Sequence, residues 1–155
     1  MSDNLSREEI VAKYKRNVEP LMIFVPWLRQ ISGKQVESEY KGNGLEAHSM
    51  TFPVYDSNLM QFVKKAGDGE LMTRNYQYVY SRHFLHTVED EKKAIENATL
   101  TDIQVLDGIF SKYVLGGRVK APLWNEGVTQ GIFLRIMEKY IEILTFYDSE
   151  GFKQK

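Results

Sequence analysis

The stretch from Ile132 to Tyr147 constrains the fold more than any other part of the chain. Its polar side chains recur at three- and four-residue steps, which places them on one narrow stripe of a helix: Arg135, Glu138, Lys139, Glu142 and Thr145. The rest of the circumference is apolar and must be shielded from water. The sequence therefore predicts a helix at the centre of a bundle or at a subunit interface.

Other segments carry the signals that start an amphipathic helix. Paired side chains that cap the first backbone donors of a helix occur at three places: Ser6 with Glu9, Thr87 with Asp90, and Thr101 with Gln104. Asp56 or Ser57 favours a further helix start, and Pro122 suits the first turn of another. These positions divide most of the chain into short helices.

Prolines and glycines predict where the helices break or end. Pro20 and Pro26 each remove a backbone donor, so we expect a break or kink before Val25. Gly116-Gly117 predicts a left-handed helix stop, and Gly131 interrupts or ends the helix that begins at Pro122.

Two segments deviate from this helical pattern. Alternating side chains on both sides of Gly42-Asn43-Gly44 predict a small β-hairpin near residues 34–51, which should lie on the helical body. In residues 74–86, Tyr76, Tyr78 and Tyr80 alternate as in a strand, yet their neighbours also fit a helical face. We favour the helix there.

The predicted fold is mainly α: a single-domain bundle of about six to seven helices over residues 1–155. The length of 155 residues suits one domain. We expect residues 1–5 and 151–155 to be frayed, because only the ends lack structural signals.

Composition narrows the cellular setting. The chain has no cysteine, which excludes disulfides, iron–sulfur clusters and cysteine-based zinc sites and fits a reducing compartment. The polar N-terminus does not look like a secretory signal, and the nearly apolar run Leu21–Leu28 is far shorter than the ~20 residues of a membrane span. We therefore predict a soluble, cytoplasmic protein that does not enter a membrane.

The charge distribution argues against nucleic-acid binding. The net charge is −1, and acidic and basic residues are balanced in every third of the chain, so no basic segment stands out. Arg74 and Arg82 flank the tyrosines of residues 76–80, which could stack on bases. Core packing explains such aromatic residues better, because burial uses their large apolar area.

One short segment has the spacing of a metal site. His83 and His86 lie three residues apart and Glu89 follows one turn later, a set that could hold a divalent metal if all three shared one helix. The alternative is that the histidines border an aromatic cluster and the acids begin the next helix. No phosphate loop, dinucleotide fingerprint or nucleophile elbow is present, so the sequence predicts no cofactor and leaves enzymatic activity open, with a binding role favoured.

A set of short motifs runs through the second part of the chain: Phe52-Pro53-Val54-Tyr55, Phe62, Asn75-Tyr76, Leu106, Ile109, Gly116 with Arg118, Gly131-Ile132, Ile136 and Met137. Through them the segment Phe52 to Leu144 resembles a bacterial family of small helical proteins catalogued only as a domain of unknown function. Family members carry an arginine-rich turn, Arg-Gly-Glu-Arg-Phe, of whose charged residues this chain retains Arg118. The resemblance implies a helical bacterial fold and a functional turn at Arg118, and it implies no activity.

Three functional hypotheses follow. The first is a non-catalytic bacterial protein that acts through self-association or a protein partner, because an apolar last helix needs cover. The second is a small enzyme or a ligand- or metal-binding protein whose site lies between the hairpin and the helices, built from His83, His86, Glu89 and Arg118. The third, ranked last, is a nucleic-acid-binding regulator.

Overall fold

The computed structural model describes residues 6–32, 37–41, 51–55, 57–120 and 122–147. Its α-helices (α), 3₁₀ helices (η) and strands (β) follow in this order: α1 Arg7–Val18, η1 Glu19–Phe24, α2 Val25–Ile31, β1 Glu37–Lys41, β2 Thr51–Tyr55, α3 Ser57–Asp68, α4 Tyr76–Arg82, α5 Val88–Asn97, η2 Leu100–Asp102, α6 Gln104–Gly116, α7 Pro122–Thr129 and α8 Ile132–Tyr147. The mainly α bundle predicted from the sequence is confirmed. Its described part holds eight α-helices where about six to seven were expected. The predicted fraying concerns residues outside these ranges.

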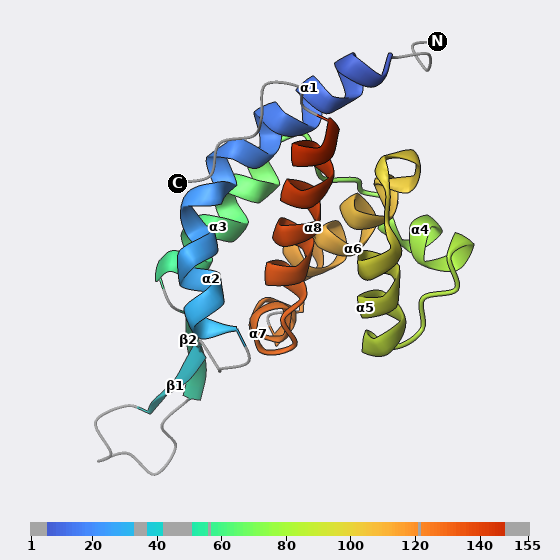
Figure 1. Ribbon diagram of the computed structural model, residues 1–155. Helices are drawn as coiled ribbons and strands as arrows, with labels where there is room; N and C mark the ends of the chain where they lie inside the picture. The colour runs from blue at the N-terminus through green and yellow to red at the C-terminus, as the bar shows by residue number, and fades with distance from the viewer. Residues whose placement is uncertain (1–5, 33–36, 42–50, 56, 121, 148–155) are drawn as a thin grey trace.

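Helix α8 lies in the middle of the bundle in the view of Figure 1. Helices α1, α2, α5, α6 and α7 all contact it, and eight of its residues are buried: Ile132, Phe133, Ile136, Met137, Tyr140, Ile141, Ile143 and Leu144. The aromatic rings of Phe62, Phe110 and Phe133 pack against one another beside it, with centroids 5.2 to 5.9 Å apart. Of the two predicted placements, the centre of the bundle is the observed one, so the chain's own helices cover most of the apolar surface of α8.

Two of the three predicted capping pairs are confirmed. Ser6 and Glu9 close a capping box at the start of α1, and Thr87 and Asp90 close one at the start of α5. The third pair was wrong: Asp102 accepts from the backbone of Thr99, so the cap lies two residues earlier and begins η2. The proline predictions agree with the structure, since η1 separates α1 from α2 at the expected break.

The predicted left-handed stop at Gly116-Gly117 was also wrong. Gly117 keeps right-handed helical angles, with φ −67° and ψ −18°. Glycine is needed there for close packing instead, because a Cβ on Gly117 would lie 2.1 Å from the Trp124 ring, whose Nε1 donates to the carbonyl of Val114 at 2.9 Å. Among the glycines that the structure describes, Gly131 is the left-handed one, with φ 74°, and it ends the helix that begins at Pro122 as the sequence indicated.

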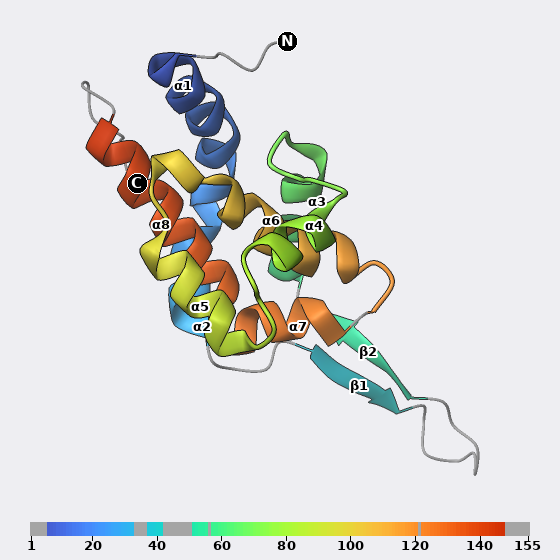
Figure 2. The same ribbon diagram turned by 90° about the vertical axis from the view of Figure 1, so that its right-hand side faces the viewer.

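The hairpin forms, with a different second strand. Strands β1 and β2 pair antiparallel, Glu37 opposite Tyr55 and Lys41 opposite Thr51. Residues 45–49, predicted as the second strand, lie outside the described residues. The hairpin projects from the bundle (Figures 1 and 2), so the prediction that it lies on the helical body was wrong. The ambiguous segment of residues 74–86 contains helix α4, as favoured.

Candidate functional site

A carboxyl group on α6 joins three helices. Asp107 Oδ2 accepts a hydrogen bond of 2.5 Å from the hydroxyl of Tyr14 in α1, and its Oδ1 accepts one of 2.5 Å from the hydroxyl of Tyr140 in α8. The centroids of the two tyrosine rings lie 5.9 Å apart, so the rings pack against each other while both hydroxyls reach the same carboxyl. Asp107 remains partly exposed on its other side, where it lines a pocket.

Burial sets the ionisation of this group. Removal of water raises the pKa of Asp107 to about 6, although the two tyrosine hydroxyls and the nearby Lys13 ammonium favour the charged form. Desolvation also raises the pKa of both Tyr14 and Tyr140, so each hydroxyl keeps its proton and remains a donor. A carboxyl with a raised pKa at the floor of a pocket is a feature typical of functional sites.

The loop after α3 forms one wall of this pocket and is fixed at two points. The backbone N–H of Glu70 donates to Asn17 Oδ1 of α1 at 2.8 Å. The backbone N–H of Thr73 donates to Ser111 Oγ of α6 at 2.8 Å, and that hydroxyl donates to the carbonyl of Asp107 at 2.6 Å. The wall is therefore tied to the same helix turn that presents the carboxyl.

Helix α4 forms the opposite wall because a glycine lets it come close. A Cβ on Gly108 would lie 2.5 Å from a methyl carbon of Val79, so only glycine permits this approach of α4 to α6. Gly108 directly follows Asp107 in the sequence, and Val79 lines the pocket. Close helix packing thus brings side chains of α4 into the lining of the same pocket as the carboxyl.

The resulting pocket has a volume of about 530 Å³ and a largely polar lining. Its charged or titratable members come from α1, α4, α6 and the two connecting segments: Lys13, Glu70, Arg82, His83, Asp102 and Asp107. A concave site with a few convergent polar groups is the usual form of a small-molecule site. We refer to it below as the Asp107 pocket.

The structure brings one of the three predicted metal ligands into this pocket. His83 ends α4 and lines it, whereas Phe84, with a left-handed φ of 57°, turns the chain before His86. The two histidines therefore do not share one helix, which the predicted metal spacing requires. Asp90 instead accepts from the backbone N–H of His86 at 2.9 Å, which lowers the pKa of Asp90, as expected of an acid that begins a helix.

No group of three His, Cys, Asp or Glu side chains that could hold a metal occurs within the described ranges. Glu89 is exposed in the first turn of α5 and does not line the Asp107 pocket. The metal hypothesis for His83, His86 and Glu89 thus gains no support from the arrangement of these side chains.

Arg118 lies at a different place. It is exposed in the turn after α6 and lines a separate, smaller pocket with Met60, Lys64 and Trp124. A Cβ on Gly67 would lie 2.4 Å from an Arg118 guanidinium nitrogen, so the side chain lies over the end of α3. The turn singled out by the family resemblance does not contribute to the Asp107 pocket.

A second buried carboxyl lies between α4, α5 and α6. Glu91 is 2% exposed and accepts hydrogen bonds of 2.6 Å from the hydroxyls of Tyr80 and Tyr113. Lys112 Nζ lies 2.9 Å from its Oε2 and neutralises it. Tyr80 is thus partly buried and bonded to Glu91, in agreement with the favoured core-packing interpretation, while Tyr78 is 55% exposed.

Sequence reasoning missed both carboxyls, although a signal existed. Asp107 lies four residues after Ile103 and three before Phe110, which are both buried, so it occupies the inner face of α6. A lone acid at such a position must be hydrogen-bonded or carry a function, because an unpaired buried charge is costly.

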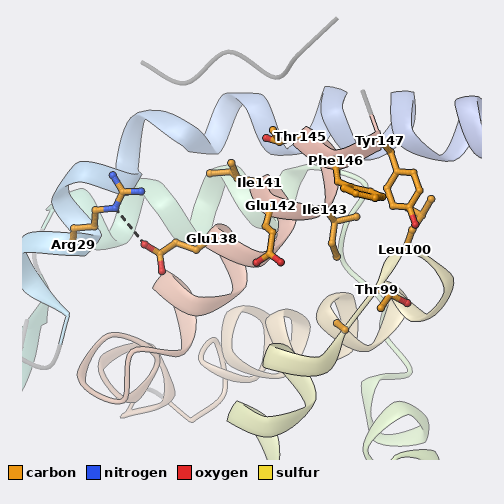
Figure 3. A pocket seen from close by; sticks show the side chains of 11 residues that line it. Arg29, Thr99, Leu100, Glu138, Ile141, Glu142, Ile143, Thr145, Phe146 and Tyr147 are labelled. Atoms are coloured by element: carbon orange, nitrogen blue, oxygen red, sulfur yellow. Dashed lines mark hydrogen bonds and ion pairs between the residues drawn. The ribbon is translucent and has the colours of Figure 1, made fainter. Parts of the chain in front are cut away.

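An apolar groove of about 660 Å³ runs along the outer face of α8 (Figure 3). Phe146 and Tyr147 lie together at one end, and the ion pair of Arg29 with Glu138, 3.3 Å between Nε and Oε2, lies at the other. Phe146 is 80% exposed. We call this surface the α8 groove.

No helix in the described ranges is long and apolar enough to cross a membrane. Comparison of the chain with models of protein families, with curated proteins and with solved structures finds no match in any of the three. The family resemblance of residues 52–144 therefore stays a prediction, and function has to be argued from the Asp107 pocket and the α8 groove.

Proposed function

We propose that the protein binds a small polar ligand in the Asp107 pocket. The observation that carries this proposal is the position of the Asp107 carboxyl, which lines the pocket and is held there by hydrogen bonds from two tyrosine hydroxyls. It has no ion-pair partner among the described residues, unlike Glu91, which Lys112 neutralises.

The free-energy cost of desolvating a carboxylate supports this assignment. A desolvated carboxylate without a cation is expensive, so a purely structural role would be served better by a neutral side chain. The pocket gives the carboxyl an open side, from which a ligand could complete its hydrogen bonding. The pocket's polar lining and its size, about 530 Å³, suit a small molecule.

The test is an NMR screen of ¹⁵N-labelled protein against small polar compounds of positive, negative and zero charge. We expect at least one compound to shift amide signals of residues that line the Asp107 pocket, with saturation. Asp107→Asn should weaken that binding at least about tenfold, as loss of one charge-assisted contact does. Asp68→Asn, an exposed acid of α3 outside the pocket, is the matched control. Shifts confined to other surfaces, or equal binding by the Asp107→Asn variant, would exclude the proposal.

A second candidate function, self-association through the α8 groove, is favoured by one observation. Phe146 stays 80% exposed beside an apolar groove, although eight other residues of α8 are buried within the chain. The charged groups of the groove already pair within the chain, Arg29 with Glu138 and Glu142 with Lys139, so the surface left for a partner is the apolar one. A second copy of this chain, docked by two-fold symmetry, would cover the same apolar surface on both molecules.

Light scattering coupled to size-exclusion chromatography tests this candidate. We expect the protein to elute as a dimer at high concentration and Phe146→Glu to elute as a monomer. Ile23→Glu is the control, since Ile23 is also an exposed apolar residue, 71% exposed, and lies outside the groove. A monomer at all concentrations would exclude self-association. A cytoplasmic location and a protein partner stay predictions from the sequence.

A further inference from the structure

The lining of the Asp107 pocket offers two cations without a carboxylate partner among the described residues. The ammonium of Lys13 lies 5.8 Å from the centroid of the Tyr14 ring, whose hydroxyl binds Asp107. The guanidinium of Arg82 donates to the hydroxyl of Tyr78 at 3.2 Å. Neither contact neutralises a charge, so both side chains can still pair with an anion.

The other two acids of the pocket already accept hydrogen bonds within the chain. Glu70 pairs with Arg16 at 3.1 Å and also accepts from Asn17. Asp102 accepts from the backbone N–H of Thr99 at 2.7 Å, which caps η2 and leaves its charge in place. The lining groups without an ion pair among the described residues are therefore two carboxyls, Asp107 and Asp102, and two cations, Lys13 and Arg82.

Resting on the proposed function, we propose that the ligand of this pocket is a small aminocarboxylate, whose ammonium group pairs with Asp107 and whose carboxylate pairs with Lys13 and Arg82. A carboxylate offers about four acceptor positions, of which the two tyrosine hydroxyls use two. An ammonium group has three donors and can fill the remaining positions with charge-assisted bonds.

Charge balance distinguishes this ligand from simpler ones. A plain amine can pair with Asp107, but Lys13 and Arg82 repel it. A plain carboxylate can pair with the two cations, but Asp107 repels it. A molecule with both groups satisfies all three side chains, and the fork of Arg82 suits a carboxylate in particular.

The experiment is an NMR titration of the intact protein with matched probes. The aminocarboxylates are glycine, β-alanine, γ-aminobutyrate and δ-aminovalerate, which differ in the distance between their two charges, and n-butylamine and butyrate are the single-charge controls. We expect one aminocarboxylate to bind at least about tenfold more tightly than either control, because it makes one additional charge-assisted contact.

Two variants test separately the contact proposed for the ammonium group of the ligand and the contact proposed for its carboxylate. Asp107→Asn should abolish binding of the aminocarboxylate and of butylamine. Lys13→Met should remove the advantage of the aminocarboxylate over butylamine and leave butylamine binding unchanged or tighter. Lys64→Met, an exposed lysine of α3 outside the pocket, is the control and should change neither. The Lys13 comparison remains informative even if Asp107→Asn fails to fold.

Butyrate binding as tightly as the best aminocarboxylate, or a Lys13→Met variant that keeps the full advantage, would overturn this ligand assignment. So would the absence of pocket shifts with all four aminocarboxylates. If other polar compounds still shift the pocket signals in the wider screen, only the ligand class is wrong. If none does, the proposed function fails with it.

Discussion

The hydroxyl of Tyr140 donates a hydrogen bond of 2.5 Å to Oδ1 of Asp107, which ties the central helix α8 to the carboxyl at the floor of the pocket. Tyr140 has no solvent exposure, and Tyr14 of α1 binds the other carboxyl oxygen. Any change in the charge of Asp107 therefore acts on the contacts among α1, α6 and α8, so the same group links stability to the proposed site.

Asp107 should make stability depend on pH. The pKa of Asp107 is raised to about 6 in the folded protein and is ~3.9 in the unfolded chain. Between these two pH values the folded protein holds a proton that the unfolded chain has released. The stabilisation is thus complete below about pH 4 and is lost as the pH rises through about 6, a change on the order of 3 kcal/mol. In Asp107→Asn this component is absent. Urea unfolding from pH 4 to 7.5 should therefore show wild type losing stability relative to the variant.

The opposite trend would contradict this prediction. If wild type gains stability over Asp107→Asn as the pH rises, the tyrosine hydroxyls and Lys13 outweigh burial and the pKa of Asp107 lies below its ordinary value. Asp68→Asn serves as the control, because this exposed carboxyl should give a nearly flat difference.

Tyr140→Phe should destabilise the protein more at neutral than at acid pH. At pH 7.5 the hydroxyl donates to a charged carboxylate, and its removal lowers the free energy of unfolding by about 1.5–3 kcal/mol. At pH 4 the carboxyl is protonated, and the same removal costs about 1 kcal/mol. Tyr78→Phe, at an exposed tyrosine, should cost little at either pH. Chemical unfolding at both pH values measures the difference. An equal loss at both would mean that the hydroxyl does not bond to the charged carboxylate.

The elements that could be predicted are those whose signals are local. The capping box of Ser6 and Glu9 spans three residues, and the apolar circumference of α8 repeats within each turn, so both follow from neighbours in the sequence. The placement of α8 at the bundle centre needed one further step, because an apolar surface has to be covered.

The Asp107 site could not be predicted in this way. Its hydrogen-bond partners Tyr14 and Tyr140 lie 93 and 33 residues away along the chain, so no local spacing joins them. Gly117 shows the same limit: its local pattern indicated a left-handed stop, and the packing of Trp124 against it decided the outcome. Contacts between residues far apart in the sequence therefore determine the Asp107 site. The metal spacing of His83 and His86 also depends on one continuous helix, and the turn at Phe84 ends that helix.

Gly108→Ala should loosen the wall that α4 gives to the pocket. The new Cβ would lie 2.5 Å from a Val79 methyl carbon, and overpacking of this kind costs about 1–3 kcal/mol. Helix propensity acts in the opposite direction, since alanine is favoured over glycine by about 1 kcal/mol. The double variant with Val79→Ala removes the clash and should recover most of the lost melting temperature. No recovery would show that α4 does not rest on this glycine.

Glu91→Ala should be the most destabilising of these changes. Two tyrosine hydroxyls and the Lys112 ammonium lose their shared acceptor in a site that is 2% exposed, which costs about 3 kcal/mol or more. For a chain of this size the melting temperature should fall by about 6–12 °C. Asp68→Ala breaks an exposed pair, Lys64 with Asp68, and should change stability by less than about 1 kcal/mol. Adding Lys112→Met to Glu91→Ala should restore part of the loss, because the unpaired cation is removed. If Glu91→Ala proves as stable as Asp68→Ala, Glu91 is not the acceptor that holds α4, α5 and α6 together.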